Sequence, residues 1–163
     1  MKVSSLKITL FALLISYWGP VSATLIYNLA DDFDGWPNNP NGAWSYGYKD
    51  YVSGLPAGAF HMDTIILDRG WNKVYGGIAS EIWKNYSANT AYGIGPGQVS
   101  INGDGGATST VRWTAPDTGT VDIVGSFGPG DWGIGYRGVF LNNQLEWASN
   151  YGQAGSFNLG NLT

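Results

Sequence analysis

Apolar and polar residues alternate on both sides of a Pro-Asp-Thr-Gly turn, and this pattern constrains the fold most. On the arm 110–115, Val111 and Trp113 alternate with polar neighbours, and the arm 121–127 repeats the pattern after the turn. Residues two apart on a strand share one face, so strict alternation is typical of strands with one buried face. The pattern predicts an antiparallel hairpin formed by these two arms.

Comparable short segments recur at intervals of about ten residues and are separated by turn signals, which favours a β-sandwich. The chain has 25 glycines and no cysteine, and 15% of its residues are aromatic whereas 12% are charged. This composition is typical of all-β proteins and atypical of disordered chains. The sequence therefore predicts a single antiparallel β-sandwich of jelly-roll type. Further strands are expected at 24–28, 44–48, 60–67, 81–84, 98–101, 137–141, 144–147 and 157–159, with loops at 30–37 and 51–58, irregular structure over the rest of 71–92, and a primed turn at 142–143.

Residues 1–23 have the features of a secretory signal peptide. Two lysines precede an apolar stretch from residue 8 to residue 18, and the small-residue sequence Val-Ser-Ala ends at Ala23. The apolar stretch is shorter than the roughly 20 residues that a membrane-spanning helix needs. We expect cleavage after Ala23, a mature β-sandwich domain over 24–163, and a secreted, extracellular or cell-surface location.

The charge balance limits the classes of partner. The whole chain has a net charge of −4, and both lysines of the leader are lost on cleavage while all 12 acids remain. An acidic surface repels phosphate groups, so we expect neither nucleic acid nor, after cleavage, a membrane as a partner. Neutral saccharides and calcium remain compatible with this charge.

Two longer motifs give the chain a family resemblance. NPNGAWSYGY at 39–48 and VRWTAPDTGTVDIVGSF at 111–127 resemble a family of exported bacterial β-sandwich proteins, many of which carry a C-terminal PEP-CTERM sorting tail. The likeness covers most of 33–160, including the IWKNYS and GIGPGQVSI segments. It implies a fold similar to carbohydrate-binding jelly rolls, and it implies no catalytic residues.

This chain departs from the family pattern at its C-terminus. Members of that family continue with one or two further strands and then the sorting tail, none of which follows Thr163 here. The resemblance thus implies a sandwich lacking its last strand or strands. An open edge strand invites pairing with another chain, so self-association is an expected property.

Trp44, Tyr46 and Tyr48 occupy alternate positions of one predicted strand and therefore share a face. Flat aromatic faces stack on the apolar sides of sugar rings, so this face is one candidate binding platform. The alternative is that the three rings fill the core.

A second candidate surface is a group of aromatic residues in loops. Trp132 lies in a Gly-rich loop between two predicted strands, and loops on a rigid scaffold often carry binding residues. Trp36, Trp71 and Tyr136 are expected to join it on a ligand surface. The alternative is that the loop tryptophan covers the end of the core.

No cofactor is expected, except that structural calcium remains an open alternative. Asp31, Asp32 and Asp34 are close enough in sequence to supply carboxylate oxygens to this cation, and the turn 102–104 is a second place for it. The EF-hand pattern of glycine and bidentate glutamate is missing, and a solvated acidic loop is the alternative interpretation.

The sequence predicts no enzymatic activity. Glu81 and Glu146 are the two glutamates, and nothing in their spacing forms the carboxylate pair of a glycosidase. The predicted function is non-catalytic binding of carbohydrate or another extracellular polymer. The alternatives are a self-associating structural surface or matrix protein and an atypical glycosidase. Asn85 and Asn161 each begin a glycosylation sequon.

Overall fold

The computed structural model describes residues 25–163 apart from short segments, and this part of the chain contains eleven strands and one helical turn. The all-β prediction is confirmed, while the jelly-roll arrangement stays a prediction. The predicted leader, 1–23, lies outside the described residues. The description excludes 34–37, 53–54, 63–64, 68–69, 76–77, 104–106 and 131–134, and it excludes the side chains of 50–52, 55–58, 65–67, 70–75, 78–80 and 107. The elements are α1 (Leu29–Asp32), β1 (Trp44–Val52), β2 (Leu55–Met62), β3 (Ile65–Leu67), β4 (Gly70–Tyr75), β5 (Ile78–Lys84), β6 (Val99–Asn102), β7 (Ala107–Trp113), β8 (Val121–Phe127), β9 (Gly138–Leu141), β10 (Gln144–Ala148) and β11 (Gly155–Leu162).

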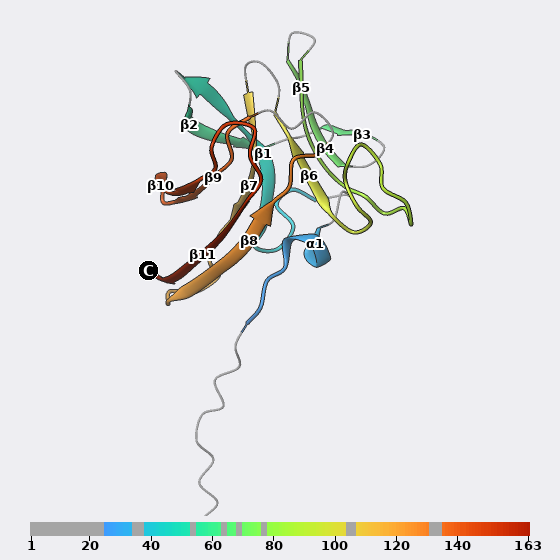
Figure 1. Ribbon diagram of the computed structural model, residues 1–163. Helices are drawn as coiled ribbons and strands as arrows, with labels where there is room; N and C mark the ends of the chain where they lie inside the picture. The colour runs from blue at the N-terminus through green and yellow to red at the C-terminus, as the bar shows by residue number, and fades with distance from the viewer. Residues whose placement is uncertain are drawn as a thin grey trace, which may run out of the picture.

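The strands form four antiparallel sheets (Figure 1). A three-stranded sheet has the order β2-β1-β7, and a four-stranded sheet has the order β3-β4-β5-β6. The remaining strands form two ribbons, β8 with β11 and β9 with β10. The two larger sheets contact each other mainly through β1 and β7 on one side and β5 and β6 on the other.

The core lies between these two larger sheets. Tyr46 on β1 and Ile82 on β5 are completely buried, and the Phe33 ring packs edge-on against Tyr46 with centroids 4.9 Å apart. Half-buried Trp44 and Val111 extend the cluster on the same face of the β2-β1-β7 sheet. Burial of such large apolar side chains is the main stabilising contribution to a fold of this kind.

The predicted hairpin between β7 and β8 is wrong in its pairing, although both segments are strands. β7 pairs with β1, with Val111 opposite Tyr46, and β8 pairs with β11, with Ile123 opposite Leu159. Alternation defines which residues share a face, but it does not define which strand lies alongside. Both arms therefore keep their predicted alternation with different partners.

Other local predictions are also wrong. The described residues 25–28 form no strand; the Asn28 side chain caps α1 in the segment predicted as loop. The predicted loop at 51–58 contains the end of β1 and the start of β2, and the predicted strand 60–67 is divided between β2 and β3. The segment expected to be largely irregular contains the β4–β5 pair. At 51–58 and 70–80, pairing with a neighbouring strand outweighs the local sequence signal, whereas at 28–32 the Asn28 cap starts a helical turn.

The β9–β10 hairpin is confirmed, including its turn. Asn142 and Asn143 have φ angles of 49° and 69°, and Gln144 pairs with Leu141. Two consecutive left-handed residues characterise the primed turns that match the twist of paired strands.

The Asn-Pro-Asn-Gly segment begins β1 through side-chain contacts. Asn39 Nδ2 donates to the carbonyl of Tyr46 at 2.6 Å, and the Tyr46 N–H donates to Asn39 Oδ1 at 3.0 Å. Asn41 pairs with Trp44 through two backbone hydrogen bonds. The motif therefore shapes the backbone at the start of β1.

Candidate functional site

The aromatic face of β1 is not a flat exposed platform. Tyr46 has an exposed fraction of 0%, so the prediction that its ring contacts a ligand is wrong. Trp44 is half-buried and its Nε1 donates to Asp32 Oδ2 at 3.0 Å, while Tyr48 stacks on His61 with centroids 4.9 Å apart. Trp44 and Tyr48 are therefore engaged by contacts within the protein, and Tyr46 is a core residue.

The loop candidates are only partly described. Trp36 and Trp132 lie outside the described residues, and Trp71 lies on β4 with its side chain outside the description. Tyr136 is described, and 56% of it is exposed. Of the four residues predicted to form this surface, Tyr136 is therefore the one whose side-chain contacts the structure describes.

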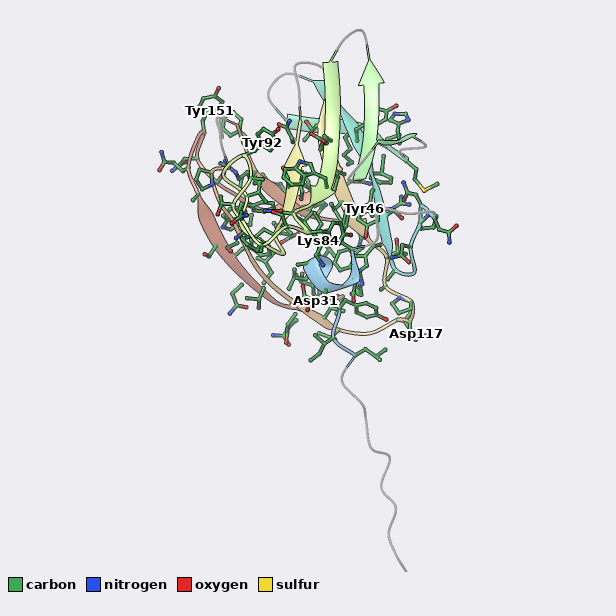
Figure 2. All side chains as sticks on the ribbon, turned by 90° about the vertical axis from the view of Figure 1, so that its right-hand side faces the viewer. Asp31, Tyr46, Lys84, Tyr92, Asp117 and Tyr151 are labelled. Atoms are coloured by element: carbon green, nitrogen blue, oxygen red, sulfur yellow. The ribbon has the colours of Figure 1, made fainter. Side chains whose placement is uncertain are left out.

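Tyr136 forms a pair with Tyr151, a residue that the sequence analysis did not single out. The ring centroids lie 5.2 Å apart at an interplanar angle of 60°, and Tyr151 is also 56% exposed. Figure 2 shows Tyr151 at the periphery of the molecule, in contrast to Tyr46 in its interior. Tyr151 lies in the turn between β10 and β11, so no local pattern connects it with Tyr136.

Arg137 holds the loops that carry this tyrosine pair. Its Nη1 donates to the carbonyl of Gln153 at 2.7 Å, and its Nη2 donates to the carbonyl of Pro129 at 3.4 Å. The Gly152 N–H also donates to the carbonyl of Gly135 at 3.2 Å. Because one planar guanidinium bridges segments that flank both rings, the tyrosines are presented by a fixed support.

Two further exposed tyrosines have different surroundings. The Tyr86 hydroxyl donates to the carbonyl of Phe33 at 3.3 Å, and Lys84 Nζ lies 5.3 Å from the centroid of the Tyr86 ring. Tyr92 packs edge-on against Trp83 with centroids 6.2 Å apart.

The acidic residues of α1 are engaged with N–H donors. Asp31 Oδ2 accepts from Asn28 Nδ2 at 2.6 Å, and Asp32 Oδ2 accepts from the Asn28 N–H and from Trp44 Nε1. Asp34 lies outside the described residues, as does the second proposed calcium ligand, Asp104. Among the residues described, no three potential ligands from His, Cys, Asp and Glu gather around a common point.

Asn85, the first residue of the sequon Asn85-Tyr86-Ser87, is buried and has a structural role. Its Nδ2 donates to the carbonyls of Asn89 and Ile94, both at 2.8 Å, and its Oδ1 accepts from the Ser87 N–H and hydroxyl. Both amide protons are therefore used inside the loop 85–98. This network accounts for the asparagine in the IWKNYS segment.

The two glutamates lie in different sheets, Glu81 on β5 and Glu146 on β10.

In the described part of the chain, no helix has the length and apolar character needed to cross a membrane.

No protein-family model, curated protein or solved structure matches this chain.

Proposed function

We propose that this chain is an exported, non-catalytic domain that binds carbohydrate or a similar extracellular polymer through exposed aromatic rings. The observation that carries the proposal is the Tyr136–Tyr151 pair, in which two half-exposed rings meet at the ends of neighbouring loops. Rings of this kind offer apolar faces for the C–H groups of a sugar and hydroxyls for its oxygens. The family resemblance agrees with this proposal.

The fixed support of the pair favours binding. Arg137 bridges the carbonyls of Pro129 and Gln153, so little side-chain and loop ordering is required when a ligand arrives. Trp132, four residues before Tyr136 in the sequence, is proposed as a third ring of the surface. A few stacking contacts correspond to dissociation constants in roughly the micromolar to millimolar range.

The proposal is tested by titrating the protein with a panel of soluble oligosaccharides while its intrinsic fluorescence is recorded. We expect at least one oligosaccharide to bind, and Tyr136→Ala and Tyr151→Ala each to weaken its binding about tenfold, as the loss of a stacking contact implies. Tyr86→Ala removes an equally exposed ring elsewhere and serves as the control. Binding that is unchanged in both pair variants would overturn the site.

Self-association is a second candidate function, favoured by the β8–β11 ribbon. Each of these strands has one partner among the described strands, and neither contains Lys, Arg or Pro; the protective features of this ribbon are Asp122 on β8 and an irregular register between Leu159 and Leu162. Val124 on β8 is 73% exposed. We propose that a second copy pairs with this ribbon.

Analytical ultracentrifugation across a range of concentrations tests the second candidate. Concentration-dependent oligomers that Val124→Lys reduces would support it, with Ser126→Ala on the same outer face as the control. A monomer at every concentration would exclude self-association as a function.

A further inference from the structure

The face of β1 opposite the core carries a buried cation. Lys49 has an exposed fraction of 8%, and its Nζ donates to Asn143 Oδ1 at 2.8 Å. Nζ also lies 5.7 Å from the centroid of the Phe140 ring. Both contacts come from the β9–β10 hairpin, whose turn therefore lies over this face.

A second cation reaches the same face from β7. Arg112 is opposite Ser45 in the register, two positions from Gly47 and four from Lys49 along β1, so the register places both cations on one face. The Arg112 guanidinium lies 4.3 Å from the centroid of the Phe60 ring, and Phe60 is the residue opposite Lys49 on β2. Both cations are thus neighbours of Phe60.

Gly47 makes this approach possible. It lies between Ser45 and Lys49 on the same face, directly in the path from Arg112 across β1 to Phe60. Because glycine has no side chain, the long arginine side chain crosses the strand without obstruction. A Cβ atom at this position would also collide with the carbonyl oxygen of His61.

The two positive charges are not neutralised within the described part of the chain. Lys49 contacts an amide oxygen and a ring, Arg112 contacts a ring, and no described carboxylate lies within ion-pair distance of either. A lysine ammonium has three donors, of which Asn143 uses one. Docking of the β9–β10 hairpin accounts for the bond between Lys49 and Asn143. The neutral amide of Asn143 does not balance the charge of the ammonium, however, and a buried charge is costly unless it is paired.

We infer that this face is a binding site for the anionic group, a carboxylate or a sulfate, of an acidic saccharide. The exposed Arg112 supplies the charge-assisted hydrogen bonds, the buried Lys49 adds positive charge beneath the β9–β10 turn, and the half-exposed Phe60 supplies apolar surface for the sugar ring. In an acidic chain with few cations, two on one face favour an anion over a neutral group. The saccharide part of the inference rests on the proposed function; the anion site rests on the β1 face alone.

Calorimetry with a galacturonate pentamer and with its methyl ester tests the inference, because the two ligands share one sugar backbone and esterification replaces each carboxylate charge by a neutral methyl ester. We expect the acid to bind roughly tenfold tighter than the ester, a preference that weakens with added salt. Arg112→Gln, an exposed position, should abolish the preference. Lys84→Gln, which removes a cation over the Tyr86 ring, is the matched control and should preserve it.

A second titration uses sodium galacturonate and follows the side-chain NMR signals of Lys49 and Arg112. Shifts of both signals support the anion site, and the absence of any shift overturns it. Equal binding of the pentamer and its ester overturns the inference and leaves the proposed function intact. If neither pentamer nor panel member binds but galacturonate shifts both signals, the proposed function fails and the anion site stands.

Discussion

The side chain of Asn39 pairs with the backbone of Tyr46 as a neighbouring strand would, donating to its carbonyl and accepting from its N–H. Asn39→Ala leaves both backbone groups of a buried residue without these partners. We expect the free energy of unfolding to fall by about 2–4 kcal/mol, at roughly 1–2 kcal/mol per group. Urea denaturation measures this. Asn39→Asp keeps the acceptor and removes the donor, so an intermediate loss should result; equal losses in both variants would contradict the pairing.

Asn85 organises the loop 85–98 through four side-chain hydrogen bonds. Its replacement by alanine removes all four of these bonds and leaves the Ser87 N–H without its acceptor, while the Asn89 and Ile94 carbonyls keep the Ser87 hydroxyl and the Ala91 N–H as donors. We expect a loss of about 2–3 kcal/mol in the free energy of unfolding and faster amide exchange in this loop. Asn158→Ala, at an exposed position of β11, should change stability by less than about 0.5 kcal/mol. Similar losses in the two variants would contradict a structural role for Asn85.

Two glycines of the β8–β11 ribbon lie against aromatic rings, Gly125 against Phe157 and Gly155 against Trp147. A Cβ atom at Gly125 would lie 2.5 Å from Phe157 Cζ, and one at Gly155 would lie 2.7 Å from Trp147 Cζ2. These rings stack on each other and on Phe127, so neither can move without disturbing the cluster.

Alanine at Gly125 or at Gly155 should therefore lower the free energy of unfolding by about 1–3 kcal/mol, the usual cost of overpacking. Thermal denaturation followed by near-ultraviolet circular dichroism reports both the stability and the environment of the rings. Gly128→Ala is the control, because a Cβ atom there meets no atom within 4 Å. An unchanged near-ultraviolet spectrum in both ribbon variants would argue against this packing.

Ile82 is completely buried between the two larger sheets, whereas Val124 on β8 is largely exposed. We expect Ile82→Ala to lower the free energy of unfolding by roughly 2–5 kcal/mol, because it removes buried apolar volume and leaves a cavity. Val124→Ala should lower it by less than about 0.5 kcal/mol. Urea denaturation of both variants checks the position of the core, and comparable losses would place it elsewhere.

Local sequence patterns predicted the positions of two strands and of one turn correctly, because short-range interactions determine these features. The alternation of β7 and β8 identified both strands, and the Asn142–Asn143 dipeptide identified a turn whose φ angles are positive at both residues. The partners of β7 and β8 could not be predicted, because the edges that they occupy are offered by β1 and β11, distant segments of the chain.

The same limit applies to the candidate sites. Tyr136 was identified from its loop, but its partner Tyr151 lies beyond a complete hairpin. The pairing of Lys49 with Asn143 joins β1 to a turn near the other end of the chain. The aromatic alternation of β1 identified a shared face correctly, but it is the packing of Phe33 and of Ile82 on β5 against that face that buries Tyr46.

The pairing of β1 with β7, instead of β7 with β8, affects the rate of folding. In a chain that emerges from its N-terminus, β1 has only β2 alongside it until more than about 50 further residues have followed, and closing so long a segment is slow. The β1–β7 pair therefore raises the mean sequence separation of the contacts in this sheet, and folding should be slower than in a chain whose adjacent strands pair.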